Sequence, residues 1–198
     1  MEHINEVQIG NYILRTYYDD SPSDPREDDN LTKMVCFHPR YPLGDDHDYK
    51  ADDFDSWDEM EKKITGDEDP LIIKPLYLFD HGGITISTKS FGCNWDSGQV
   101  GFVFVTKQDV RDSFFLKRCG QAIKERVDVL LEGEVETYAK YLTGQVYGYE
   151  VSKMVTDEDG DQHEKGLERC GSYYDEEQCI FDGMKTLEWF VNNEQVEV

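Results

Sequence analysis

The stretch that most constrains the fold is residues 76–105, because it holds three of the strongest strand patterns in the chain. Residues 76–79 and 84–88 are β-branched or aromatic runs on either side of Asp80-His81-Gly82-Gly83, a turn whose glycines can adopt positive φ. Residues 100–105 are almost wholly apolar, which is typical of a strand covered on both faces. We therefore expect this stretch to form the centre of a sheet on which the remaining chain packs.

Hydrophobic periodicity predicts the elements around this centre. Apolar residues three to four apart predict a long helix at about 121–142, a C-terminal helix at about 175–193 and a shorter helix near 54–64. Further strands are expected at 7–18, with a bulge or turn at Gly10-Asn11, and at 31–38, 71–79, 146–155 and 167–174. Pro75 predicts an edge or a bulge within its strand.

Strands and helices do not alternate regularly along the chain, which favours an α+β fold over a doubly wound one. The length of 198 residues fits a single domain, residues 1–198, with a mixed or mainly antiparallel sheet packed by the long helix and the C-terminal helix. Residues 19–69 form an acidic, loop-rich segment of that domain.

The balance of charge restricts the class of partner. With 43 acidic and 20 basic residues the formal net charge is −23, and no basic stripe is present. A nucleic-acid-binding protein needs a basic face, so we expect no direct binding to DNA or RNA. A basic protein partner or a cation fits the charge, and solubility or a halophilic origin is the other explanation. No apolar run approaches the roughly 18 residues of a membrane span, so we expect no membrane partner.

The acidic residues are concentrated between positions 19 and 69, where 18 acidic and 6 basic residues give a net charge of −12. Their mutual repulsion must be offset by a bound cation, by a basic partner or by buried pairing with Arg26 and Arg40. The candidate partner-binding carboxylates are Asp19, Asp20, Asp24, Glu27, Asp28, Asp29, Asp45, Asp46, Asp48, Asp52, Asp53, Asp55, Asp58 and Glu59.

Cysteine usage and the first residues predict a protein of the cytoplasm. The five cysteines are an odd number without C-x-x-C spacing, as expected of free thiols in a reducing compartment. The first ten residues lack the basic and apolar regions of a secretory signal. No P-loop, G-x-G-x-x-G or G-x-S-x-G motif is present, so no cofactor is predicted apart from a possible divalent cation.

One acidic loop partly matches a calcium-binding pattern. Asp157, Asp159, Asp161 and Glu168 stand at positions 1, 3, 5 and 12 of an EF-hand-like loop. The glycine needed at position 6 is absent, however, and the flanks have strand rather than helix patterns. The favoured interpretation is the tip of a β-hairpin with Asp159-Gly160 as its turn, and a weak cation site is the alternative.

A second candidate site consists of histidines and aspartates in turns that follow strand-like runs. Such side chains can form a metal site or an acid–base site if they converge, and otherwise they are ordinary loop residues. The segment Trp95-Asp96-Ser97-Gly98-Gln99 is interpreted as a structural turn or as the polar rim of a pocket. The candidate catalytic residues are His38, Asp45, His47, Asp80, His81 and Asp96.

Several peptides together resemble a family of uncharacterised proteins encoded by phages and mobile elements. The resemblance covers most of residues 20–150 and implies a viral accessory protein that acts in the cytoplasm of a bacterial host. It is carried by Pro25-Arg26-Glu27, Asn30-Leu31, Met34-Val35-Cys36-Phe37-His38, Arg40-Tyr41, Leu43-Gly44-Asp45, His47, Tyr49, Trp95-Asp96-Ser97-Gly98-Gln99-Val100-Gly101 and Tyr141-Leu142-Thr143-Gly144-Gln145-Val146-Tyr147-Gly148.

Charge and resemblance together predict a non-enzymatic, phage-type counter-defence protein. Its carboxylates would replace DNA phosphates in the basic groove of a host nuclease or CRISPR-type effector, and so inhibit that defence complex. Two alternatives remain open. One is a metal-assisted hydrolase built from the histidines and aspartates, and the other is a module that binds a small ligand at the rim of residues 95–99.

Overall fold

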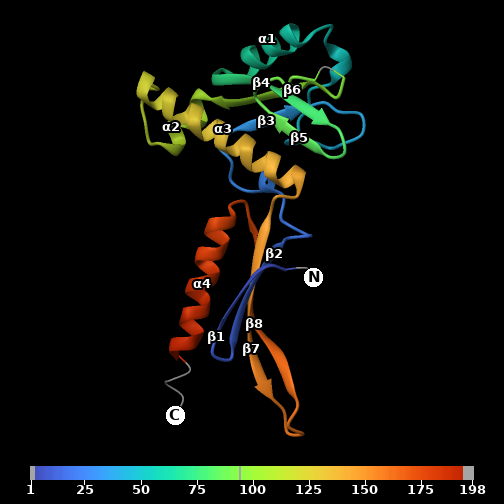
Figure 1. Ribbon diagram of the computed structural model, residues 1–198. Coiled ribbons are helices and arrows are strands. Elements are labelled where there is room, and N and C mark those ends of the chain that lie inside the picture. Colours follow the sequence, from blue (N-terminus) through green and yellow to red (C-terminus); the bar gives the residue numbers. More distant parts are fainter. Residues whose placement is uncertain (1–2, 94, 194–198) are drawn as a thin grey trace. The chain divides into compact units, whose positions relative to one another are not determined.

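The computed structural model describes residues 3–93 and 95–193, and Asn94 of the predicted turn lies outside them. The chain has an α+β fold, as predicted, with two antiparallel sheets (Figure 1). It divides into two compact units: unit 1 comprises Met1–Ser23 and Gly144–Val198, and unit 2 comprises Asp24–Thr143. This division is based on contacts within the folded chain and does not test whether the two units unfold together. The expectation of a single domain therefore stays a prediction.

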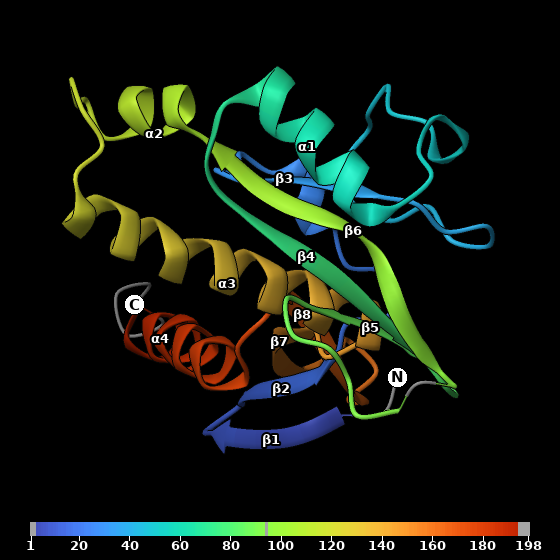
Figure 2. The ribbon, with the colours of Figure 1, turned by 90° about the horizontal axis from the view of Figure 1, so that it is seen from above.

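The sheet of unit 2 is built largely from residues 76–105, as the strand patterns predict. Its order is β3 (Lys33–Cys36), β6 (Ser97–Thr106), β4 (Pro70–Asp80) and β5 (Ile84–Ser87). Helices α1 (Trp57–Glu68) and α3 (Gln121–Thr143) cover its two faces (Figure 2). The remaining elements of the unit are α2 (Lys107–Ser113) and two short 3-10 helices, η1 (Pro25–Glu27) and η2 (Ala51–Asp53).

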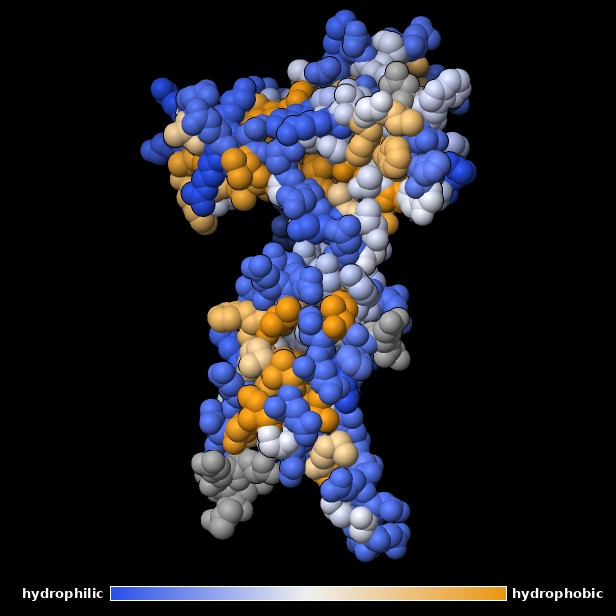
Figure 3. Space-filling model, in the orientation of Figure 1, coloured by the Kyte–Doolittle hydropathy of each residue, from blue (hydrophilic) through white to orange (hydrophobic). Residues whose placement is uncertain are grey.

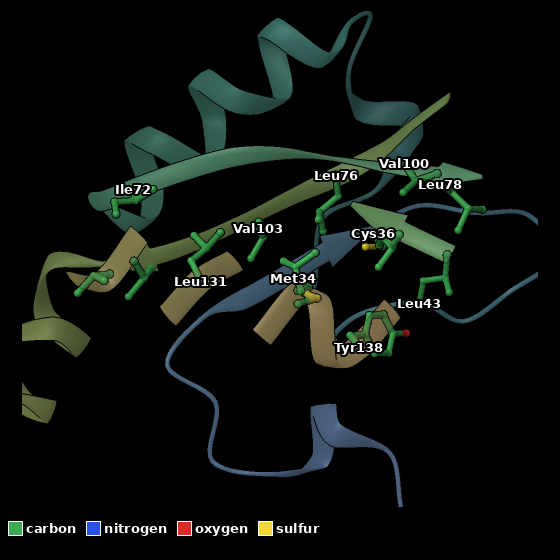
Figure 4. Close-up of a cluster of buried hydrophobic side chains, with 14 of the residues drawn as sticks. Met34, Cys36, Leu43, Ile72, Leu76, Leu78, Val100, Val103, Leu131 and Tyr138 are labelled. Carbon is green, nitrogen blue, oxygen red and sulfur yellow. The ribbon is translucent and has the colours of Figure 1, made fainter. Parts of the chain in front are cut away.

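Strand β6 is apolar because successive side chains point into two different cores. Val103 packs with Leu131 of α3 in the larger core (Figure 4). Phe102 and Phe104, on the other face, pack with Ile64 of α1. The continuous apolar run at residues 100–105 is therefore explained by burial of β6 on both faces of the sheet.

Pro75 lies where β4 is locally an edge. Strand β5 pairs with β4 only from Tyr77 to Asp80, so the half of β4 that contains Pro75 has no strand neighbour on that side among the described residues. The register with β6 also shifts between Leu76 and Tyr77. Both features match the prediction of an edge or a bulge, since proline cannot donate to a sheet ladder.

Unit 1 has a sheet of its own, with the order β1 (His3–Ile9), β2 (Tyr12–Tyr18), β7 (Tyr147–Thr156) and β8 (Gln162–Tyr173). The helix α4 (Glu176–Asn193) packs on it through Leu187, against Leu14 and Val151 of the sheet. The predicted strand at 7–18 is a hairpin, in which Gly10 adopts a φ of 61°. The strands are thus shared between two sheets, where the sequence pattern suggested one centre.

Polar side chains link the strands of the unit 1 sheet. Arg15 on β2 donates to Glu6 of β1 at 2.6 Å and forms an ion pair with Glu164 of β8. Ser152 of β7 also donates to Glu164. These hydrogen bonds, first from Arg15 and then from Ser152, lower the pKa of Glu164 below its ordinary value of 4.5.

We expect Glu164→Gln to destabilise the protein at pH 7 but not at low pH. A carboxylate whose folded pKa is depressed adds stability above its unfolded pKa, and this contribution is lost as the pH falls through the folded pKa. The loss in free energy of unfolding should therefore be full above a pH of about 4.5 and should shrink as the pH falls below this value, through the folded pKa. Urea unfolding of both proteins at pH 7 and pH 3 measures this, with Glu158→Gln at the hairpin tip as the control. An equal loss at both pH values would contradict the prediction.

Candidate functional site

The acidic segment is carried mainly by η1, β3, η2, α1 and the loops of unit 2. Helix α1 begins at an N-cap, where the Ser56 hydroxyl accepts from the Glu59 amide at 3.3 Å. Met60 and Ile64 are buried, and the ring of Trp57 packs edge-on against Phe102 with centroids 6.0 Å apart. These apolar contacts fix one face of α1, so its acidic residues remain on the solvent side.

A groove of about 590 Å³ lies beside this helix. We call it the acidic groove. Five carboxylates, two aromatic rings and two lysines line it: Asp48, Asp53, Glu59, Asp67, Glu68, Tyr49, Phe54, Lys33 and Lys63. An aromatic wall with a carboxylate rim suits a ligand that combines apolar and positively charged groups.

Some of these carboxylates have partners and others do not. The Tyr49 hydroxyl lies 3.3 Å from Glu68 and 3.4 Å from Asp67, and Lys63 pairs with Asp67 at 2.8 Å. Burial, followed by the charge of Glu68, raises the pKa of Tyr49, which keeps its hydroxyl protonated as a donor. Among the described residues, none forms an ion pair with Asp48 or Asp53. The groove therefore keeps free negative charge.

The predicted partner-binding carboxylates divide by their structural role. Asp19 lies in unit 1 and accepts from the Ser172 amide at 2.8 Å, and Asp24 caps η1 through the Arg26 amide. Asp45 accepts from Arg26 and from the Met34 amide. The others are exposed: Asp20 in unit 1, and Glu27, Asp28, Asp29, Asp46, Asp48, Asp52, Asp53, Asp55, Asp58 and Glu59 in unit 2.

Buried pairing with Arg26 offsets part of the repulsion, as one of the predicted alternatives requires. The Arg26 side chain is only 4% exposed, and its guanidinium binds Asp45 through two hydrogen bonds of 2.7 and 2.8 Å. It also lies 3.4 Å from Glu134 of α3. Arg40, in contrast, is 65% exposed and pairs with Asp80 outside the segment, so its expected buried pairing is wrong.

The six candidate catalytic residues are only partly brought together. His38, Asp80 and Asp96 line one cavity of about 520 Å³, and His81 lies 3.3 Å from the Asp96 carboxylate. Asp45 and His47 line a different cavity, of about 700 Å³, which shares His38 with the first.

The candidate catalytic residues already have structural partners, and Asp45 and His47 illustrate this. Asp45 is held by Arg26, and His47 Nε2 lies 3.0 Å from the Cys36 carbonyl. Across residues 3–93 and 95–193, no group of three histidine, cysteine or carboxylate side chains is placed to hold a metal ion. The hydrolase alternative therefore has no metal-holding cluster among the described residues to support it, and the ligand-binding alternative, which needs no metal, stays a hypothesis.

The EF-hand-like loop is the tip of a hairpin, as favoured. Asp157 accepts from the amides of Asp159 and Asp161 at 3.1 and 2.9 Å, and Gly160 adopts a φ of 89°. Glu168 pairs with Val151 in the middle of the β7–β8 ladder. It therefore does not join the three aspartates at the tip, so the four residues do not form one calcium loop.

Sequence reasoning did not single out Tyr49, Phe54, Asp67 or Glu68 as parts of a site. The signal that was available is the interleaving of aromatic and acidic residues over 48–55, next to an amphipathic helix. The predicted turn at residues 95–99 is confined to Trp95 and Asp96, because Ser97–Gln99 already belong to β6, and the Asp96 carbonyl accepts from the Asp80 amide at 2.8 Å beside the β4–β6 ladder. Trp95 beside it is 96% exposed.

Comparisons with known proteins leave the geometry as the main source of inference. No protein-family model matches the chain, and neither the curated proteins nor the solved structures contain a significant match. In the described part of the chain, every helix is too short or too polar to cross a membrane.

Proposed function

We propose that the protein binds a positively charged surface of another protein through the acidic face of unit 2. This face comprises the acidic groove and the adjacent exposed carboxylates Asp46, Asp52, Asp55 and Asp58. The observation that carries the proposal is the free negative charge of this face, since no described residue forms an ion pair with Asp48, Asp52, Asp53 or Asp58. Unpaired carboxylates held on a rigid helix and its preceding loop favour a cationic partner.

The partner that fits best is the nucleic-acid groove of a host nuclease or CRISPR-type effector. Such grooves are built to attract phosphates, and surface carboxylates can take their place. The protein would then act as a counter-defence inhibitor, partly by DNA mimicry, without binding nucleic acid itself. The assignment to a phage context, in the cytoplasm of a bacterial host, rests on the family resemblance of residues 20–150.

We expect binding to the partner to be sensitive to salt and to exclude DNA. Exposed charges are screened as ionic strength rises, so affinity should fall at least about tenfold between about 50 and 500 mM salt. The partner is obtained by capture from a bacterial lysate at low salt, and its affinity for this protein is then measured by calorimetry. Duplex DNA added to the complex should compete for the same groove.

Matched charge variants locate the surface. Asp52→Asn, Asp53→Asn and Asp58→Asn combined should weaken binding about tenfold. The control combines Glu125→Gln, Glu158→Gln and Glu188→Gln, which remove the same charge elsewhere and should leave affinity unchanged. Affinity that does not change from about 50 to 500 mM salt rules out charge mimicry. Simultaneous binding of DNA and this protein rules out a shared groove.

A further inference from the structure

The turn between α2 and α3 differs in chemistry from the rest of this acidic chain. Residues 111–126 contain five basic and two acidic residues, a net charge of +3 within a chain of −23. We call Phe114-Phe115-Leu116-Lys117-Arg118 the basic loop. Figure 3 shows hydrophobic and strongly hydrophilic residues side by side over this turn. A basic and apolar segment of this kind is expected to dock against an acidic surface that also offers apolar contacts.

Phe115 is held outward in a conformation that phenylalanine disfavours. Its φ is 53°, a left-handed conformation that is unfavourable for phenylalanine. The residue is 95% exposed, so burial of the ring does not offset this unfavourable backbone energy. The Leu116 amide donates to the Arg111 carbonyl at 2.8 Å, which fixes the turn. Phe114 instead packs on the core, under the guanidinium of Arg126 at 5.0 Å. The fold thus displays one aromatic ring on a well-anchored loop, as expected for a contact outside the unit.

The acidic groove offers the complementary chemistry. Tyr49 and Phe54 supply aromatic surface for the Phe115 ring, and Asp48 and Asp53 supply free carboxylates for Lys117 and Arg118. Its volume of about 590 Å³ lies within the range of about 300–1,000 Å³ that holds small ligands. The two surfaces therefore match in both polarity and charge.

We propose that the basic loop of one copy docks into the acidic groove of a second copy. Because the two surfaces are different, the contact is heterologous, and each added copy leaves one loop and one groove free. Self-association of this kind occupies the groove proposed above for a host partner, and the two would compete. The inference does not depend on that partner, since its test uses this chain alone.

The test begins with the oligomeric state of the full chain as a function of salt. Sedimentation equilibrium at about 50 mM salt should give a mass above 23.0 kDa that rises with concentration, and a mass of 23.0 kDa at about 500 mM. Phe115→Asn removes the ring and places a residue that tolerates positive φ at this position. It should abolish self-association without lowering the Tm. Phe181→Asn, at an exposed aromatic of unit 1, is the matched control and should retain association.

Complementing variants decide whether loop and groove are the two partners. Lys117→Glu with Arg118→Glu disables only the basic loop, and Asp48→Asn with Asp53→Asn disables only the acidic groove without creating a positive site for the Glu-substituted loop. Each variant alone should be monomeric, whereas an equimolar mixture should form a two-chain complex and nothing larger. A monomeric wild-type chain at about 50 mM salt, or a monomeric mixture, overturns the proposal. Loop-dependent binding to phosphatidylserine vesicles without self-association would instead assign the loop to an anionic lipid surface.

Discussion

Arg26→Met is expected to lower the free energy of unfolding by about 3–5 kcal/mol, because it leaves the partly buried carboxylates of Asp45 and Glu134 without their counter-charge. Two of the Arg26 hydrogen bonds go to Asp45, and a third goes to the Thr32 carbonyl at 2.8 Å. Burial by itself lowers the pKa of Arg26, but the hydrogen bonds and charge of Asp45 outweigh it, so the pKa lies above its ordinary value. The guanidinium is therefore charged in the folded state. Its removal leaves the negative charges of Asp45 and Glu134 unbalanced, which lowers the free energy of unfolding.

The same arginine helps to attach the acidic loop to α3. Glu134, 3.4 Å from Arg26, accepts from the amides of Leu31 and Thr32 at 2.8 and 3.1 Å. Without Arg26, this carboxylate keeps only neutral donors, namely the two amides and the Thr32 hydroxyl. We therefore expect the loop before β3 to loosen along with the global loss of stability.

The control for this prediction is Arg40→Met in the same segment. Arg40 is exposed and its pair with Asp80 faces solvent, so the expected cost is about 0–1 kcal/mol. Urea unfolding followed by tryptophan fluorescence measures both, since Trp57 packs in the core of unit 2. Combining Arg26→Met with Asp45→Asn should cost less than the sum of the single changes, because the second change removes the stranded charge. Strict additivity, or equal effects of the two arginine changes, would contradict the buried-pair account.

Gly101→Ala should destabilise unit 2 by about 3 kcal/mol or more, because no space exists for a methyl group at that point of the sheet. Gly101 lies in β6 between Cys36 of β3 and Leu76 of β4. A Cβ atom there would lie 1.9 Å from the Val35 carbonyl oxygen and 2.9 Å from the Cys36 Cα. Both are backbone atoms, so the strands themselves would have to separate.

Gly98→Ala in the same strand is the matched control. A Cβ atom at Gly98 meets no atom of the described residues within 4 Å, so this change should leave stability within about 0.5 kcal/mol. Differential scanning calorimetry should show the Tm of Gly101→Ala lowered by at least about 6 °C, with little change for Gly98→Ala. Similar Tm values for the two variants would show that β3 can move away from β6, and would contradict the packing argument.

Local patterns in the sequence were enough to identify most elements. The 3.6-residue period predicted α3 and α4 almost to their ends, because the apolar residues on the buried face of an amphipathic helix recur every three to four positions. The apolar run at 100–105 predicted a strand buried on both faces, and Pro75 marked a local edge. Buried pairing with Arg26 could only be offered as one alternative, with no carboxylate named as its partner, because sequence separation says nothing about which of several charges will meet.

Composition and periodicity are local properties, and they were sufficient to predict the α+β class, the central strands of unit 2 and the concentration of negative charge between residues 19 and 69. The packed chain was needed to show that the strands form two sheets and that Asp19, Asp24 and Asp45 accept hydrogen bonds within the fold. It was also needed to show that Asp48 and Asp53 share a groove with Tyr49 and Phe54. Strand pairing, burial and the meeting of charges depend on contacts between distant residues, and these acquire definite partners only when the chain has packed.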